Sequence, residues 1–131
     1  MEKNMSESQP RERWCINLDW HLENDCSLST LAQSYLCTKC RNKFTRDTEA
    51  SKVVQNIANC CAQSRDFFDR NASVLATVFR IFLANGNNPL HVEELAHELA
   101  KRRGEYNPTI SPQVLERLIR NDRYYGLRPV P

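Results

Sequence analysis

Two cysteines separated by two residues, Cys37 and Cys40, constrain the fold of this chain more than any other feature of its sequence. Thiolates at this spacing can bind one tetrahedral metal ion from a single tight turn. Four further cysteines stand at positions 15, 26, 60 and 61. We therefore expect the N-terminal half of the chain to fold around a metal ion.

The remaining ligands depend on which other side chains approach this pair. We predict a site made of Cys15, Cys37, Cys40 and Cys60, with Cys61, Cys26 and His21 as alternates. Four thiolates with no open position make a closed structural site, for which zinc is the simplest ion. An Fe–S cluster is less favoured, because the closely set run of three or four cysteines common in ferredoxins is missing. The competing interpretation is that the cysteines are free and pack as small hydrophobic residues.

Chain length explains why a metal ion would matter. The chain has 131 residues, so each half alone would have only a small core. Residues 1–14 contain no apolar run typical of a secretory signal, and we expect a cytoplasmic protein with reduced thiols. No run approaches the roughly 18 apolar residues of a membrane-spanning helix, so no membrane partner is expected. The formal charge of +2 is too balanced to demand a nucleic-acid or membrane partner by itself.

The N-terminal part divides into an arm and a Cys-rich region. Residues 1–13 are polar and charged, which predicts a disordered arm. Residues 14–70 are predicted to form a metal-binding helical region. Within it, residues 14–20 alternate large apolar and polar side chains, as a short strand or extended segment does.

Two helices should carry the cysteines of this region. The first is capped by Ser27 or Ser29 and leads the chain into Cys37. The second is expected over about residues 48–68, where apolar residues recur at helical spacing. A continuous helix would turn only one of the two adjacent cysteines, at 60 or 61, toward the interior, and the spacing does not decide which one.

Residues 71–131 are predicted to form a domain of three amphipathic helices followed by a short β-prone tail. The sequence leaves open whether the two halves fold as one domain or as two. Gly86 and Gly104 suit the left-handed position that ends a helix, and Ser111 followed by Pro112 is typical of a helix start. The buried face of the third helix is predicted to carry Val114, Leu115, Leu118 and Ile119. The predicted fold is mainly α, with a zinc-knuckle-type N-terminal half packed on a winged-helix-like three-helix C-terminal half.

Several sequence motifs resemble those of known proteins. Residues 89–95, the third helix opened by Ser111 and Pro112, and residues 121–128 resemble the winged-helix module of the bacterial RNA polymerase delta subunit and its HARE-HTH-like relatives in chromatin and restriction proteins. The resemblance implies a helix that reads the major groove of DNA, although only one β-prone segment follows the third helix. The whole chain also resembles small uncharacterised bacterial proteins that share both cysteine pairs, the turn at residues 83–87 and the Tyr-Tyr-Gly-Leu-Arg ending.

Basic and polar side chains of the second and third C-terminal helices are candidate nucleic-acid contacts. They are Lys101, Arg102, Arg103, Gln113, Arg117 and Arg120. Arginine and glutamine can contact phosphates or base edges, whereas Glu116 on the same face weakens a phosphate-binding stripe. The alternative is an ordinary charged helix face with i, i+4 pairs such as Glu116 with Arg120.

No pattern of catalytic residues stands out. A Ser-His-Asp set, a carboxylate pair and a Gly-rich phosphate loop are all missing, and the chain has three glycines. We therefore predict a non-enzymatic, metal-stapled binding module without a small-molecule substrate, with DNA or the transcription machinery as candidate partner. The alternative is a protein-interaction or assembly factor that does not bind DNA. A thiol redox protein is the third hypothesis, disfavoured because the Cys-x-x-Cys pair follows a helix and has no βαβ surroundings.

Overall fold

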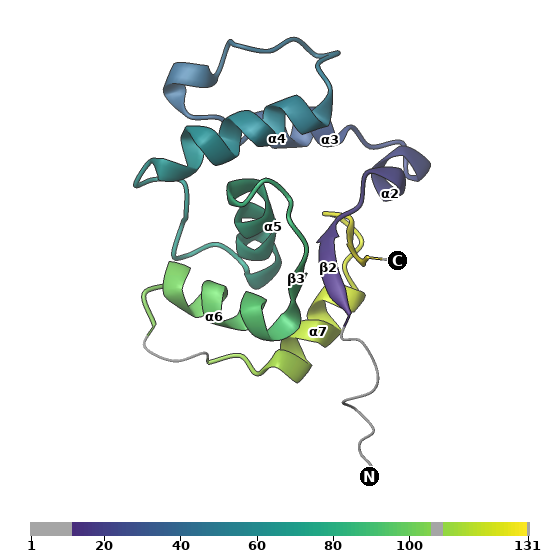
Figure 1. Ribbon diagram of the computed structural model, residues 1–131, viewed down its shortest axis with the longest axis vertical. Coiled ribbons are helices and arrows are strands. Elements are labelled where there is room, and N and C mark those ends of the chain that lie inside the picture. The colour runs from purple at the N-terminus through teal and green to yellow at the C-terminus, as the bar shows by residue number, and fades with distance from the viewer. Residues whose placement is uncertain (1–11, 106–108, 131) are drawn as a thin grey trace.

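The computed structural model describes residues 12–105 and 109–130. These residues form six α-helices, two short 3-10 helices and three short strands (Figure 1). In chain order the elements are β2 (Arg13–Ile16), α2 (Leu18–Glu23), α3 (Leu28–Gln33), η1 (Thr38–Cys40), α4 (Ala50–Asn59), η2 (Cys61–Gln63), α5 (Val74–Ala84), β3 (Leu90–His91), α6 (Val92–Arg102), α7 (Pro112–Arg120) and β4 (Leu127–Pro129). The mainly helical character predicted from the sequence is confirmed. None of the helices in the described ranges is long and apolar enough to cross a lipid bilayer.

The three strands form one antiparallel sheet in the order β3-β2-β4. The central strand comes from the N-terminal part of the chain, and both outer strands come from the C-terminal part. Trp14 of β2 is paired with Leu90 on one side and Pro129 on the other. The sheet therefore joins the two predicted regions, 14–70 and 71–131, through backbone hydrogen bonds.

Helix α5 lies at the centre of the molecule, between α4 on one side and α6 on the other (Figure 1). The middle and the second half of its apolar face are buried, with Phe79 and Phe82 at 0% exposure, whereas Val74 and Leu75 in its first turn are half-buried. The buried residues of both predicted regions belong to one hydrophobic cluster, which also includes Trp14 of the central strand. Packing one helix between two layers lets a chain of this size bury a continuous core.

The ends of the C-terminal helices follow the sequence prediction. Gly86 (φ +74°) and Gly104 (φ +72°) adopt the left-handed conformation immediately after the caps of α5 and α6. After α5, the N–H of Asn87 donates to the carbonyl of Phe82 at 2.6 Å, the hydrogen bond that defines a Schellman motif. Ser111 caps α7 by accepting from the N–H of Val114 at 3.2 Å. These glycine and serine positions could be predicted from the sequence, because helix ends need a left-handed residue or a capping side chain.

The strand predicted over residues 14–20 is wrong in its second half. The strand ends at Ile16, and Asn17 opens the short helix α2. The Asn17 side chain accepts a hydrogen bond from the N–H of Trp20 at 2.9 Å. Asparagine is a strong N-cap residue, and this local hydrogen bond favours helix over the extended conformation that the apolar alternation indicated.

The helix predicted over residues 48–68 is also shorter than expected. Helix α4 ends at Asn59, because Cys60 (φ −133°, ψ −66°) leaves the helical conformation. The chain then makes the 3-10 turn η2 from Cys61. The apolar spacing that predicted the helix was real, since Val53 and Ile57 are fully buried, but it could not locate the end.

Only half of the predicted apolar face of α7 is buried. Leu115 and Ile119 are at 0% exposure, whereas Val114 and Leu118 are 42% and 39% exposed. The helix packs on α6 and β4, so one stripe of its surface faces the core. Among the described residues, β4 is the single strand that follows α7. It pairs with β2, from the N-terminal part of the chain, and not with a second strand after α7 as in the hairpin of a wing.

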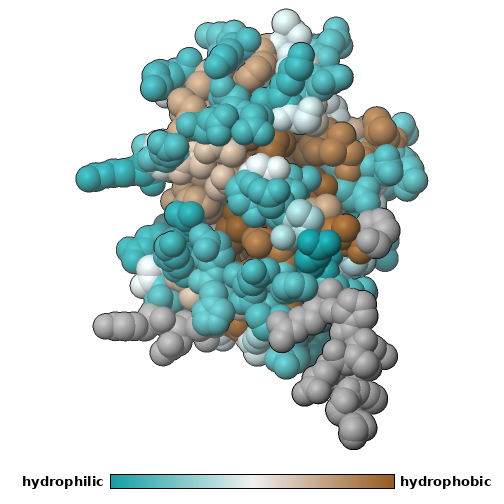
Figure 2. Space-filling view, viewed as in Figure 1, coloured by the Kyte–Doolittle hydropathy of each residue, from teal (hydrophilic) through white to brown (hydrophobic). Residues whose placement is uncertain are grey.

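The predicted arm over residues 1–13 lies mostly outside the described residues. Its last two residues are described: Glu12 is exposed, and Arg13 begins β2. Figure 2 shows hydrophilic side chains over most of one face of the molecule, with hydrophobic surface gathered near α2. On that helix Leu18 and Leu22 are 47% and 71% exposed.

Candidate metal centre

Four cysteine thiols converge between η1 and the end of α4. They are Cys37, Cys40, Cys60 and Cys61, and their sulfur atoms all lie within 4.8 Å of one another. Cys37 directly precedes the 3-10 turn η1 and Cys40 is its last residue, while Cys60 follows the last residue of α4 and Cys61 opens η2. The four thiols, called the metal centre below, could hold a metal ion.

The break at the end of α4 explains why both adjacent cysteines join the cluster. Neighbouring side chains on a continuous helix point about 100° apart, so only one of them could face a common centre. Because Cys60 leaves the helical conformation and Cys61 starts a new turn, both side chains are redirected. The sequence prediction had allowed only one of the two to face inward.

The sulfur geometry fits a single tetrahedral ion. Zinc–thiolate bonds of about 2.3 Å place tetrahedral ligand sulfurs about 3.8 Å apart. The Sγ atoms of Cys40 and Cys60 are 3.8 Å apart. A disulfide would require about 2.05 Å, and all four cysteines are free. The donor set, four sulfurs without oxygen or nitrogen, favours zinc or another thiophilic ion over magnesium or calcium.

Two N–H donors point at the Cys61 sulfur. The backbone N–H of Cys37 lies 3.2 Å from it, and the side-chain amide of Asn56 donates to it at 3.6 Å. Such donors outside the ligand shell stabilise the negative charge that thiolates keep when they bind a metal ion. Cys61 is 1% exposed and so depends on these protein donors rather than on water.

The thiols of the metal centre do not titrate alike. The hydrogen bond with Cys61 lowers the pKa of Cys37 to about 7. Burial raises the pKa of Cys61 to about 12, and the hydrogen bond with Cys40 raises the pKa of Cys60. Cys60 and Cys61 therefore keep their protons at neutral pH. Binding of a metal cation would release these protons, because the ligand is the thiolate.

The sequence prediction differs from the structure at one ligand position. Cys15 was expected in the site, but it lies in β2, where it pairs with Arg128 of β4, and the fourth thiol of the cluster is Cys61. The sheet holds Cys15 half-buried against the core, and this burial raises the pKa of its thiol. Cys26, an alternate, is exposed and donates to the carbonyl of Asn24 at 3.3 Å.

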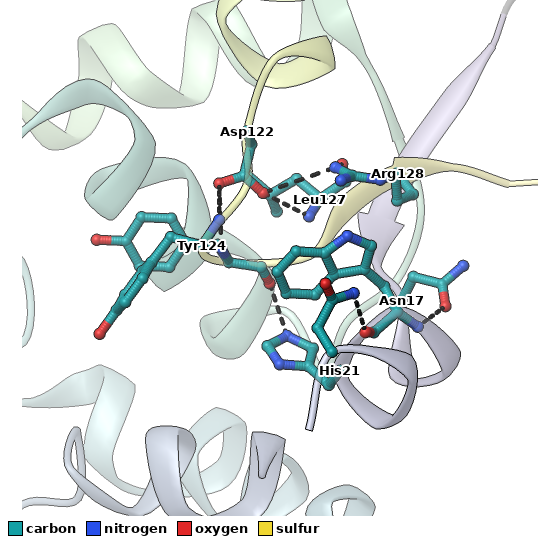
Figure 3. A network of polar contacts seen from close by, with 9 residues as sticks. Asn17, His21, Asp122, Tyr124, Leu127 and Arg128 are labelled. Atoms are coloured by element: carbon teal, nitrogen blue, oxygen red, sulfur yellow. Dashed lines mark hydrogen bonds and ion pairs between the residues drawn. The ribbon is translucent and has the colours of Figure 1, made fainter. Parts of the chain in front are cut away.

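His21, the other alternate, lies in a different environment (Figure 3). It is 2% exposed, and its Nε2 lies 2.8 Å from the carbonyl oxygen of Tyr125. Because a carbonyl only accepts, Nε2 carries the proton, and the buried Nδ1 has no hydrogen-bond partner among the described residues. Burial lowers the pKa of His21, which keeps the ring neutral. His21 therefore ties α2 to the C-terminal turn and is not among the clustered metal-binding side chains.

A buried carboxylate that sequence reasoning missed organises this C-terminal turn (Figure 3). Asp122 is 2% exposed and accepts hydrogen bonds from the N–H groups of Tyr124, Tyr125 and Leu127, at 3.0, 3.0 and 2.9 Å. The turn also requires Gly126 (φ +74°), where an added Cβ would lie 2.7 Å from the His21 Nε2. An aspartate directly after a helix and four residues before a glycine was the available signal, since aspartate side chains often bind nearby backbone N–H groups.

The predicted nucleic-acid contacts fall into two groups (Figure 1). Lys101, Arg102 and Arg103 stand at the C-terminal end of α6, which is on the left of the figure, and Gln113, Arg117 and Arg120 belong to α7 on the right. The first group is partly engaged: Arg102 pairs with Glu98 at 2.9 Å, and Arg103 donates to the Ala72 carbonyl at 3.4 Å.

On α7, Arg120 is the most engaged of the candidate side chains. It pairs with Glu116 at 2.8 Å and with Glu12, and its guanidinium lies 5.1 Å from the ring centre of Trp14. The i, i+4 pair predicted from sequence is present. Gln113 and Arg117 are exposed to solvent. Two nearby carboxylates reduce the attraction of Arg120 for phosphate, and Arg117 is the better candidate on this helix.

Comparisons with known protein families, with curated proteins and with solved structures found no match. Function must therefore be argued from the metal centre and the surface.

Proposed function

We propose that this protein is a non-enzymatic binding module stapled by one zinc ion, held by Cys37, Cys40, Cys60 and Cys61. The observation that carries the proposal is the convergence of four thiols within 4.8 Å. Four protein ligands would fill a tetrahedral ion, so no position remains for a substrate or an activated water. Zinc is preferred to an Fe–S cluster, because cluster irons lie apart and their cysteines are spread more widely than around one ion.

The proposed ion would act as a structural cross-link. It would hold the turn η1 against the end of α4. Cys40 and Cys61 face the core, at 5% and 1% exposure, while Cys37 and Cys60 lie closer to the surface. Structural zinc sites contribute directly to folding free energy, which suits a small chain.

Metal analysis of the purified protein tests this proposal. We expect about one zinc per chain and its loss, with a marked fall in thermal stability, in Cys61→Ser. Cys15→Ser is the matched control, since Cys15 is also partly buried but lies in the sheet. The control should keep its zinc and lose no more than about 1 kcal/mol. A metal content near zero in a folded wild-type protein would refute the proposed zinc site.

For the partner, we propose nucleic acid, in keeping with the resemblance to a transcription-associated winged-helix module. The support is the set of basic side chains at the end of α6 and on α7. Of these, Lys101 and Arg117 are exposed and are not paired with the carboxylates that engage Arg102 and Arg120. The test is anisotropy of labelled single-stranded and duplex DNA in a salt titration with zinc-loaded protein. Affinity should fall steeply as salt rises, because phosphate contacts release counterions. Absence of binding to either form at low salt would remove nucleic acid as the partner.

A protein partner is the alternative, and one observation favours it. Val114 and Leu118 are one turn apart on α7 and 42% and 39% exposed, whereas Arg120 on the same helix is already paired with two carboxylates. An exposed apolar pair suits a protein surface better than a phosphate backbone. In cross-linking within cells, Leu118→Glu would then lose a specific adduct that Gln113→Glu keeps.

A thiol redox role is the third proposal. It requires metal-free thiols, and the lowered pKa of Cys37, about 7, is the feature that would serve it. The same zinc determination decides this case, because a thiolate bound in a closed zinc site is not available as a nucleophile.

A further inference from the structure

A basic hollow lies between the segment that follows the metal centre and the end of α6. Its volume is about 630 Å³. Four of its lining residues are cationic, namely Arg65, Arg70, Lys101 and Arg102, and none is acidic. Phe68 also lines it, with the Arg102 guanidinium 4.5 Å from the centre of its ring.

The cations come from two separate parts of the chain. Arg65 and Arg70 follow the metal centre, whereas Lys101 and Arg102 close α6. Basic residues at the end of a helix are common, because they complement the helix dipole. That explanation covers the pair on α6 but not Arg65 and Arg70, which belong to no helix. Their convergence on the same hollow needs a different reason.

Glycine keeps the approach of the two segments close. The guanidinium of Arg70 lies over Gly104, so that an added Cβ would be 2.1 Å from its Nη2. The missing side chain at Gly104 therefore leaves room for Arg70 at the junction of the two segments, where Arg70 is exposed. Arg102 is oriented by Phe68 and by its pair with Glu98, while Lys101 and Arg65 are exposed.

A second hollow of about 570 Å³ adjoins the first. Gln63 and Ser64 line both of them, and the second also contains Lys39, Cys37 and Cys60. The two hollows together form a furrow, called the basic furrow below, that runs from the metal centre to the end of α6. Its five cations are Lys39, Arg65, Arg70, Lys101 and Arg102.

We infer that the basic furrow binds a single strand of nucleic acid through its phosphates. This inference rests on the proposed nucleic-acid function and names the surface that performs it. Cations gathered along a groove are the arrangement by which proteins follow a single-stranded backbone. Of the five cations of the basic furrow, Arg102 also pairs with a carboxylate, that of Glu98. The concave shape suits one strand, whereas a duplex is more often met by a helix that enters its major groove. The α7 surface implied by the winged-helix resemblance is then not the binding surface.

The test compares two charge-reversal variants of equal net charge in the zinc-loaded full-length chain. The furrow variant carries Arg65→Glu with Lys101→Glu. The α7 variant carries Arg117→Glu on α7 with Arg123→Glu in the turn that follows the helix. All four positions are exposed, so folding should be unaffected, and this is checked by zinc content and thermal stability. Binding to a labelled single-stranded oligonucleotide, to the duplex of the same sequence and to polyglutamate is measured over a salt series.

We expect the wild type to prefer the single strand, with a slope of log affinity against log salt near −0.7 for each phosphate contacted. The furrow variant should bind at least tenfold more weakly and lose one to two units of slope, while the α7 variant stays within about threefold of the wild type.

Three results would overturn the inference. Loss of binding in the α7 variant alone would leave the proposed nucleic-acid function intact and refute the furrow. If the wild type bound the duplex or polyglutamate as tightly as the single-stranded oligonucleotide, or more tightly, the single strand would be refuted as the occupant. No binding of the wild type to any nucleic acid at low salt would refute the furrow and the proposed function together.

Discussion

Replacing Asp122 should reveal how much of the fold depends on one buried carboxylate. Asp122→Ala removes the acceptor for the N–H groups of Tyr124, Tyr125 and Leu127. Hydrogen bonds to a charged group contribute roughly 1.5–3 kcal/mol each, and losses at neighbouring groups are less than additive. The variant also leaves the N–H of Leu127 buried without a partner, since Leu127 is at 0% exposure. We expect a loss of about 4 kcal/mol in the free energy of unfolding.

Asp122→Asn separates geometry from charge. The amide keeps one oxygen, which can still accept from Tyr124 and Tyr125, but its NH2 group then faces the N–H of Leu127 and the Arg128 guanidinium, 3.8 Å from the native carboxylate. Donor facing donor should cost about 2 kcal/mol.

Urea unfolding of the zinc-loaded variants, followed by tryptophan fluorescence, measures both losses in stability. Trp14 lies in the sheet and Trp20 lies beside Gly126 in the turn, so both report on this region. The control is Asp47→Ala, an exposed carboxylate in the loop before α4, which should change stability by less than about 0.5 kcal/mol. If Asp122→Asn were as stable as the wild type, the turn would not depend on the carboxylate, and the reasoning would be refuted.

Three further predictions concern single features of the chain. Gly126→Ala combines a left-handed φ with a clash at 2.7 Å and should lose at least about 2 kcal/mol, whereas Gly86→Ala, with open space around it, should lose only about 1 kcal/mol, both by urea unfolding. Asn87→Ala removes the hydrogen bonds that its side chain makes with the N–H and C=O of Ile16 and should cost about 2 kcal/mol; Asn88→Ala, at an exposed site, is the control. Zinc affinity should fall at least about tenfold per pH unit from pH 8 to 6 in competition with a chromogenic chelator, because Cys61, with a pKa of about 12, must lose its proton to bind; a flat profile would exclude thiolate ligation.

The predictable parts of the fold are those encoded locally. Gly86, Gly104 and Ser111 were assigned correctly, because helix ends require a left-handed residue or a capping side chain whatever the tertiary context. The spacing of Cys37 and Cys40 likewise predicted that they would lie together, because two intervening residues allow one turn to present both.

What the sequence did not predict depends on contacts between distant segments. Cys15 lies between apolar residues, a pattern that fits a metal ligand and a strand residue equally well. Its pairing with Arg128 of β4 places it in the sheet. Cys61 joins the cluster only because α4 ends one residue before Cys60, and no capping residue marks that end. The exposure of Val114 and Leu118 follows from which stripe of α7 meets the core, which periodicity alone does not specify.

The position of β2 in the middle of the sheet also sets the order in which this protein can assemble during synthesis. Strand β2 is synthesised before both of its neighbours in the sheet, and β3 and β4 emerge much later. Until they do, the edges of β2 and the large ring of Trp14 lack their partners, and they are surfaces on which a nascent chain aggregates. All four cysteines of the metal centre have emerged once Cys61 is synthesised, well before β3 and β4. A metal ion bound there would order the segments around η1 and α4 before the sheet can form.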